Sequence, residues 1–232
     1  MDGDAASWHG SAAAAAISDR LWRRVLAKLY FYYSAMNAGK TTLLLQSNYN
    51  YQARGMGTVL YTPQLDDRYG VGKITSRIGL QAESKIFDDD YDLFAGASAE
   101  MRTRPIHCVL VDEAQFMTPA QVLQCTLIVD RLDVPVLTYG LRSDFRGEPF
   151  PGAIYLLAWA DELCEIKTIG ASGKKATMNA RLDDSGQRVW SGEQVAIGHN
   201  YVSMTRSNFR LEKASPIDYT PPASSTPDSA LE

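Results

Sequence analysis

Residues 29–48 read "LYFYYSAMNAGKTTLLLQSN", and this stretch decides the fold. Its aromatic beginning is typical of a β-strand, and its end, with Leu43 to Leu45 as an apolar stripe, is typical of a helix. Between the two lies a short loop that ends in Gly39, Lys40 and Thr41. A loop of this kind turns backbone N–H groups toward an anion, and the helix adds the positive end of its dipole. The stretch therefore predicts a phosphate-binding loop in an α/β fold.

The loop departs from the usual phosphate-loop pattern at its first position. That pattern is G-x-x-x-x-G-K-[ST], and this chain has Ser34 where the first glycine is expected. A serine with an ordinary φ can make the turn, and its hydroxyl adds a donor. Lys40 would then reach the terminal phosphates, and the Thr41 hydroxyl would hold Mg²⁺. The alternative is a chance Gly-Lys-Thr at a helix start, which the strand before it and the helix after it disfavour.

A second motif, "VLVDEAQF" at 109–116, supplies two acids at the end of an apolar run. A nearly continuous apolar run is typical of a parallel strand that is covered on both faces. Asp112 lies where a carboxylate associated with Mg²⁺ belongs. Glu113 follows it, and a carboxylate there can accept the proton of an incoming hydroxyl. The alternative for Glu113 is the water-activating acid of an ATPase.

The rest of the chain alternates between strand-like and helix-like segments. Such alternation predicts an α/β fold in which a parallel, RecA-like sheet has helices on both faces. The segment 66–79 is polar and predicted to be a loop, and 88–104 is predicted to be a surface helix or loop. The predicted strands are 28–34, 58–62, 106–116, 134–141 and 163–169, and the predicted helices are 40–54, 119–132 (with Thr118 as N-cap) and 151–162.

Four regions follow from these patterns. Residues 28–169 form the nucleotide-binding core, and 170–212, which is rich in turns, forms a small β-rich lobe. Residues 1–27 are an extension, either disordered or partly helical, that could dock a partner or lie upstream of the natural start. Residues 213–232 are rich in Pro, Ser and Ala and are expected to form a disordered tail. The candidate core of the lobe is Met178, Leu182, Val189, Trp190, Val195, Ile197, Val202, Met204 and Phe209.

Composition argues against several classes of protein. The chain has 232 residues, of which 45% are hydrophobic and 22% charged, with a net charge of −4. This balance is ordinary for a globular protein and lacks the basic footprint of a nucleic-acid binder. The three cysteines are odd in number and form no Cys-x-x-Cys pair, which argues against a disulfide framework and favours a reducing cytoplasm. The longest apolar run is far shorter than the ~20 residues of a membrane helix.

These motifs, together with "DDR" at 66–68 and "YGLRSDFRGEPF" at 139–150, resemble the bacterial thymidine kinases of the type shared with the cytosolic animal enzyme. The resemblance spans about 28–210, and bacterial members are similar to this chain in having serine at the first loop position. It implies transfer of the γ-phosphate of ATP to the 5′-hydroxyl of thymidine with Mg²⁺. It also implies a homotetramer.

The resemblance also assigns roles to residues of this chain. Glu113 matches the general base, and Asp66 and Arg68 match a polar pair near the phosphates. The Mg²⁺ ligands would be Thr41 and Asp112. The ATP-binding residues would be Ser34, Ala35, Met36, Asn37, Ala38, Gly39, Lys40, Thr41, Asp112, Glu113, Ala114 and Gln115. The nucleoside pocket would be Met36, Leu141, Phe145, Phe150 and Tyr201.

The chain departs from the family in its small lobe. The family's lobe usually carries a structural zinc, whose ligand positions match Gly170, Ser172, Thr205 and Asn208 here. None of these offers a thiolate or an imidazole, so we predict that the lobe holds no zinc. The loop before Tyr201 is also about two residues shorter, with His199 in place of a second glycine.

Two other functions remain compatible with the sequence. The first is a P-loop protein that binds or hydrolyses ATP without kinase activity, because a P-loop core does not by itself specify an acceptor. The second is a kinase for another deoxynucleoside, such as deoxyuridine.

Overall fold

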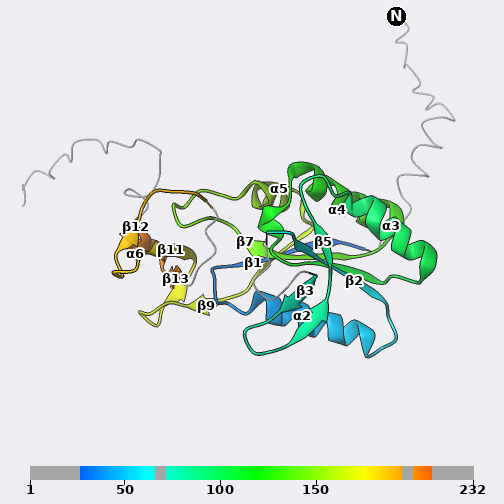
Figure 1. Cartoon of the computed structure of the whole chain (residues 1–232), viewed down its shortest axis with the longest axis horizontal. Coiled ribbons are helices and arrows are strands. Elements are labelled where there is room, and N and C mark those ends of the chain that lie inside the picture. The colour runs from blue at the N-terminus through cyan, green and yellow to red at the C-terminus, as the bar shows by residue number, and fades with distance from the viewer. Residues whose placement is uncertain (1–26, 66–71, 195–200, 211–232) are drawn as a thin grey trace, which may run out of the picture.

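The structure, a computed structural model, describes residues 27–65, 72–194 and 201–210. Its centre is a six-stranded sheet in the order β5-β2-β6-β7-β1-β8, and every strand pair in it is parallel (Figure 1). The predicted α/β fold with a parallel sheet is therefore confirmed. The strands are β1 (Leu29–Ser34), β2 (Thr58–Pro63), β5 (Lys85–Phe87), β6 (Cys108–Val111), β7 (Val136–Leu141) and β8 (Glu162–Glu165).

Helices cover both faces of the sheet, as predicted. Helix α2 (Lys40–Gln52) lies on one face, and α3 (Leu93–Thr103), α4 (Pro119–Leu132) and α5 (Pro151–Trp159) lie on the other (Figure 1). Successive side chains of a strand point to opposite faces. On β6, Val109 and Val111 thus join the cluster on the side of α3 to α5, while Leu110 joins the cluster beneath α2. Apolar packing on both sides explains the continuous apolar run that the sequence shows there.

Helix α4 begins where the sequence predicts. The Thr118 hydroxyl accepts a hydrogen bond from the Gln121 N–H at 3.2 Å, and the Gln121 side chain accepts one from the Thr118 N–H at 2.9 Å. This reciprocal pair is a capping box, which satisfies two backbone donors at the start of the helix. The helix that follows the Asp112–Glu113 segment is therefore fixed in position at its first turn.

Three short strands were not predicted. Strand β3 (Lys73–Thr75) lies within the segment 66–79 that was read as a polar loop. It pairs with β4 (Gln81–Glu83), and β5 joins the main sheet beside β2. The predicted strand 163–169 is two strands, β8 and β9 (Thr168–Ile169). Each of the three missed strands has three residues, too few for an alternating pattern to be read from the sequence.

The small lobe contains a three-stranded antiparallel sheet in the order β12-β11-β13 and the short helix α6 (Arg206–Phe209). The strands are β11 (Met178–Leu182), β12 (Arg188–Val189) and β13 (Tyr201–Met204), with β10 (Lys175–Ala176) paired to β9. In Figure 1 this lobe lies at the left of the sheet. The prediction of a small β-rich lobe is confirmed.

The packing of the lobe differs in part from the prediction. Met178 and Phe209 are buried, as expected, but Trp190 and Val202 are 37% and 36% exposed, so their assignment to the core was wrong. Trp190 instead stacks on Arg188, whose Cζ lies 3.7 Å from its ring centre and 4.0 Å from that of Phe209. The same guanidinium donates to the Phe209 carbonyl. Val195 and Ile197 lie outside the described residues.

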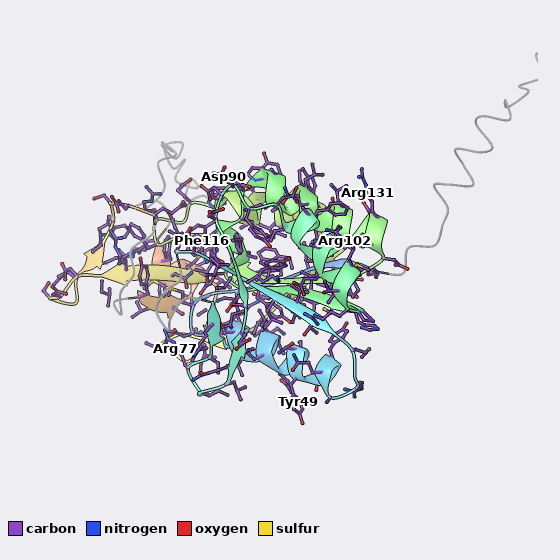
Figure 2. The ribbon with its side chains drawn as sticks, turned by 45° about the vertical axis from the view of Figure 1, so that its right-hand side comes forward. Tyr49, Arg77, Asp90, Arg102, Phe116 and Arg131 are labelled. Carbon is purple, nitrogen blue, oxygen red and sulfur yellow. The ribbon has the colours of Figure 1, made fainter. Side chains whose placement is uncertain are left out.

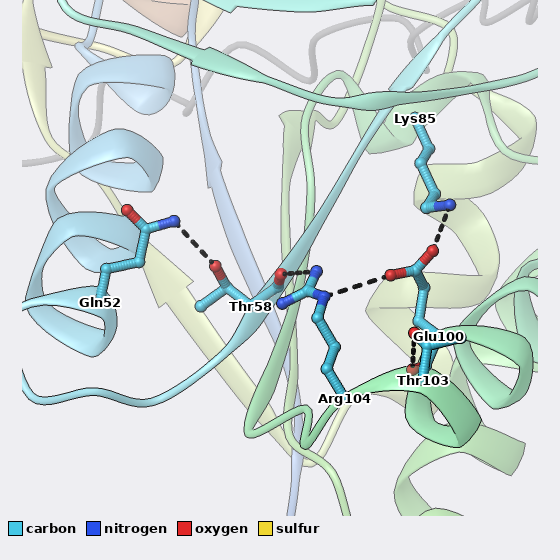
Figure 3. A network of polar contacts seen from close by, with 6 residues as sticks. All are labelled: Gln52, Thr58, Lys85, Glu100, Thr103 and Arg104. Carbon is cyan, nitrogen blue, oxygen red and sulfur yellow. Dashed lines mark hydrogen bonds and ion pairs between the residues drawn. The ribbon is translucent and has the colours of Figure 1, made fainter.

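A polar network joins the opposite end of the sheet to helix α3 (Figure 3). The Arg104 guanidinium donates to the Thr58 carbonyl at 2.9 Å, and Glu100 accepts from both Arg104 and Lys85. The hydrogen bond from Lys85 lowers the pKa of Glu100. Because Thr58 is the first residue of β2, this network lies at the amino edge of the parallel strands, away from their carboxyl ends.

Within the parts of the chain that the structure describes, no helix is both long enough and apolar enough to cross a lipid bilayer.

Candidate functional site

A cavity of about 330 Å³ lies where the carboxyl ends of β1, β6 and β7 meet the small lobe. The carboxyl edge of an open parallel sheet is where such folds bind ligands, and the volume is within the usual range for small-molecule sites. The cavity brings together most of the residues that the sequence singled out: Met36, Asn37, Ala38, Gly39, Lys40, Thr41, Glu113, Gln115, Leu141, Phe145, Phe150 and Tyr201.

The remaining candidates do not line this cavity. Ser34, Ala35, Asp112 and Ala114 are buried behind its wall. Asp66 and Arg68 lie outside the described residues, as does His199.

The phosphate loop positions its lysine through the unusual serine. The Lys40 Nζ donates to the Ser34 hydroxyl and to the Ala35 carbonyl, both at 3.2 Å. Gly39 has a φ of 82°, a left-handed conformation that a glycine adopts without strain. It precedes α2 and provides no side-chain cap, so the first N–H groups of the helix face the cavity. An anion bound there would accept hydrogen bonds from these N–H groups.

The Asp112 carboxylate is buried, and this burial disfavours its charged form. It is 3% exposed, and its pKa is raised mainly by this burial and further by the charge of Glu113. Hydrogen bonds from the Glu113 backbone N–H and from Thr41, together with the charge of Lys40, oppose the rise. A divalent cation between Thr41 and Asp112 would supply the missing positive charge, so these two oxygen donors fit Mg²⁺.

A cage of protein ligands is not required for such an ion. Across the described ranges, no three His, Cys, Asp or Glu side chains are grouped closely enough to hold a metal by themselves. Magnesium is usually bound by one or two protein ligands together with the phosphates of its nucleotide.

Glu113 projects into the cavity from a strained turn. Its φ of 46° and ψ of 41° are left-handed, a conformation that costs about 1–2 kcal/mol for a residue with a Cβ. Its Oε2 accepts a hydrogen bond of 2.7 Å from the Gln115 side-chain amide. The Gln115 Oε1 in turn accepts from the Leu141 N–H at 3.0 Å. Gln115, which is fully buried, thus connects the Glu113 carboxylate to the end of β7.

The close approach of Gln115 to β7 depends on Gly140. A Cβ at position 140 would lie 2.8 Å from the Gln115 Oε1 and 3.0 Å from its backbone nitrogen. Neither contact leaves room for a methyl group. A larger residue in place of Gly140, within the motif "YGLRSDFRGEPF", would therefore displace Gln115, whose amide is hydrogen-bonded to Glu113.

Aromatic side chains form the other half of the cavity. Phe116 meets Phe150 edge-on, with ring centres 5.6 Å apart and planes at 81°. The Arg181 guanidinium of the small lobe stacks on the Phe145 ring, with its Cζ 3.9 Å from the ring centre. Aromatic and apolar walls of this kind suit a planar base.

The cavity also includes residues that the sequence did not single out. Figure 2 shows Phe116 and Arg77 on the side of the core nearer the small lobe, and Arg102 and Arg131 at the other end. Phe116 is the last residue of the motif "VLVDEAQF", which could have identified it. Neither Asn179 nor Arg77 belongs to a recognisable motif. The cavity residues that were missed are Thr42, Leu65, Thr75, Arg77, Ile78, Phe116, Ser143, Asp144, Asn179 and Gln194.

The buried carboxylate of Asp144 holds the loop that carries Phe145. It accepts hydrogen bonds from the backbone N–H groups of Arg146 and Glu148 and pairs with the Arg146 guanidinium at 2.9 Å. These contacts fix the turn that follows β7 and therefore the direction in which Phe145 points.

Comparison with known proteins agrees with this geometry. The family model described as thymidine kinase matches residues 27–209. The thymidine kinase of Salmonella typhimurium (strain LT2) is 57% identical over 194 residues, which cover 82% of this chain and 95% of that protein. The thymidine kinase of Escherichia coli (strain K12) is 57% identical over 187 residues, 80% of this chain and 91% of that protein.

A solved structure shows a more distant likeness. It is the genome-packaging NTPase B204 of Sulfolobus turreted icosahedral virus 2, with a TM-score of 0.43 and 14% identity over 63% of this chain and 77% of that chain. The family match and the two bacterial relatives each cover about four fifths of the sequence, and the family match includes every described segment that forms the cavity. The chain belongs to the thymidine kinase family.

Proposed function

We infer that this protein phosphorylates thymidine: it transfers the γ-phosphoryl group of ATP to the 5′-hydroxyl and releases dTMP and ADP. The observation that carries this inference is one cavity in which the phosphate loop, the Glu113 carboxylate and an aromatic pocket meet. A triphosphate can lie along the start of α2 while a nucleoside occupies the aromatic half. The acceptor hydroxyl then lies between Glu113 and the transferring phosphorus.

Each residue has a definite part in the reaction. Glu113 accepts the proton of the 5′-hydroxyl as the oxygen forms its bond to the γ-phosphorus and the bond to the ADP oxygen breaks. Lys40 and the N–H groups at the start of α2 neutralise charge on the phosphates. Gln115 keeps the Glu113 carboxylate directed at the acceptor. Thr41 and Asp112 would hold Mg²⁺, which would supply positive charge to the phosphates during the transfer.

The pocket is suited to thymine in particular. The base offers a flat π-face and a methyl group, and Phe145, Phe150 and Leu141 offer aromatic and aliphatic contacts. A buried methyl group is worth roughly 10-fold or more in discrimination. Thymidine should therefore be preferred to deoxyuridine, which lacks that group.

Several finer points complete the proposal. Mg²⁺ is the required cation, the small lobe holds no zinc, and the protein works as a homotetramer in the cytoplasm without a nucleic-acid partner. The resemblance to the family supports the tetramer, and the residues at 170, 172, 205 and 208 support the absence of zinc.

The decisive experiment measures transfer of labelled phosphate from ATP to thymidine by wild type and by Glu113→Gln. We expect Glu113→Gln to lower kcat by about 10²–10⁴, because general-base catalysis contributes that much. Glu83→Gln, which removes an exposed carboxylate on β4, is the matched control and should leave kcat unchanged. Wild type that hydrolyses ATP equally with and without thymidine would overturn the proposal. Faster turnover of deoxyuridine than of thymidine would identify deoxyuridine as the preferred acceptor.

A further inference from the structure

The small lobe holds the phosphate loop at Met36. The Met36 N–H donates a 2.7 Å hydrogen bond to the Oδ1 of Asn179 on β11. The Met36 carbonyl accepts a 2.6 Å hydrogen bond from the Ser203 hydroxyl on β13. Both polar groups of this one residue are therefore bound by the lobe, although Met36 is separated from Asn179 by 143 positions and from Ser203 by 167.

The two lobe residues form one unit, which we call the Met36 clamp. Asn179 and Ser203 are directly opposite each other in the antiparallel pair of β11 and β13, so their side chains lie on the same face of the sheet. Asn179 is 3% exposed, and its amide also reaches the Ser143 carbonyl in the loop after β7 at 3.4 Å. The clamp thus holds the phosphate loop from two paired strands of the lobe.

The clamp joins the two halves of the cavity. Met36 belongs to the phosphate loop and lines the cavity next to Asn37. On β13, Tyr201 is two residues before Ser203 and so lies on the same face, and Tyr201 lines the nucleoside side of the cavity. Ser203 does not line the cavity. The contact through which its hydroxyl can act on a ligand is the hydrogen bond to Met36.

We propose that Asn179 and Ser203 are positioning residues that hold the phosphate loop in its nucleotide-binding conformation and couple it to the acceptor pocket. The coupling to an acceptor rests on the proposed function, whereas the effect on nucleotide binding does not. With both peptide groups of Met36 fixed, the loop has fewer alternative conformations. A ligand binds more weakly when only a fraction of the protein is in the binding conformation, in proportion to that fraction.

The test compares Ser203→Ala and Ser203→Thr, with Val202→Ala as the matched control. Val202 is the adjacent residue of β13, exposed and on the opposite face. The dissociation constant of a non-hydrolysable ATP analogue with Mg²⁺ is measured by calorimetry without thymidine. We expect Ser203→Ala to weaken binding by about 3- to 10-fold, the usual effect of one hydrogen bond. Ser203→Thr, which keeps the hydroxyl, should restore most of the affinity, and Val202→Ala should match wild type.

A second variant checks that the two residues act on the same group. Asn179→Ala should also weaken binding of the analogue, and the double variant should weaken it by less than the product of the single factors, because both hydrogen bonds restrain Met36. Independent sites would give the full product, which would contradict a common action. The coupling itself is read from the analogue's affinity with saturating thymidine. We expect thymidine to strengthen it more in wild type than in Ser203→Ala.

Two outcomes would overturn the proposal. If Ser203→Ala lowers the melting temperature but leaves the analogue's affinity and the KM for ATP unchanged, the hydrogen bond only stabilises the lobe. If Ser203→Thr is as impaired as Ser203→Ala, the hydroxyl is not the group responsible. Failure of the wild type to phosphorylate thymidine would refute the proposed function instead, and the analogue titration would still decide whether the clamp acts on the phosphate loop.

Discussion

The α/β core and the small lobe are built in different ways, although both contribute to one cavity. Strands β2, β6 and β7 of the core are buried along their whole length and packed by helices on both faces. The lobe has strands of two to five residues, two of its large apolar side chains are more than a third exposed, and Arg188 fills the space between Trp190 and Phe209. Under the proposed function, phosphate transfer is placed on the densely packed core, and the acceptor pocket combines core residues with Tyr201 of the less densely packed lobe.

The largest expected effect is on the stability of the core. Leu110→Ala removes a fully buried side chain from the centre of the sheet and should lower the free energy of unfolding by about 2–5 kcal/mol. Val189→Ala in the half-buried lobe strand β12 should lower it by less than about 1 kcal/mol. Urea unfolding of both variants measures the contrast, and equal effects would show that core and lobe are equally packed.

The next effect separates the stability of the core from its function. Burial raises the pKa of Asp112, so the folded protein disfavours its charged form. The resulting loss of stability is absent below the ordinary pKa of about 3.9 and grows as the pH rises through the raised value. Asp112→Asn should therefore stabilise the ligand-free protein at pH 8 by on the order of 2 kcal/mol while it abolishes phosphate transfer. Denaturant unfolding at pH 8 and pH 4 checks this, and the gain should vanish at pH 4.

A smaller effect is expected from loosening the lobe alone. Arg188→Met removes the guanidinium between Trp190 and Phe209, an interaction worth about 0.5–2 kcal/mol. Hydrogen exchange should speed up in β11 and β13 and remain unchanged in β6 and β7. Arg206→Met removes an exposed cation from the same lobe and is the control. Faster exchange throughout the core would mean that the two parts unfold together.

The smallest effect concerns the polar network at the far edge of the core. The Lys85 hydrogen bond lowers the pKa of Glu100 in the folded state, so its contribution is present above the ordinary pKa of about 4.3 and is lost as the pH falls below it. Glu100→Gln should cost less than about 1 kcal/mol at pH 7, and nothing at pH 2.5. Turnover should not change, because the network lies at the amino edge of the sheet.

The same comparison explains what the sequence could predict. The core strands were found because burial on both faces leaves a run such as "VLV" before Asp112, and α4 was found because Thr118 and Pro119 mark its start. Strands of three residues leave no such pattern. The exposure of Trp190 could not be foreseen either, because it depends on an arginine that takes the place of apolar packing.

The candidate site shows the same limit. Side chains that belong to a motif, such as Lys40 and Glu113, line the cavity together. Asn179 was missed because its role is to bind a backbone group far away in the sequence, and only the paired strands bring the two together. Gln115 was assigned to nucleotide binding by resemblance, and the structure adds its contacts with Glu113 and β7, which no spacing rule reveals.

The position of β13 also bears on the order in which the enzyme matures during synthesis. Domains form from the N-terminal side as the chain leaves the ribosome, and β13 is the last strand of the described chain. A nascent chain that has emerged only as far as α5 already has its phosphate loop and its acids, but it lacks Tyr201 and Ser203. Under the proposed function, such a precursor lacks part of the acceptor pocket, and we expect transfer to the nucleoside to begin only after translation has passed the end of the small lobe.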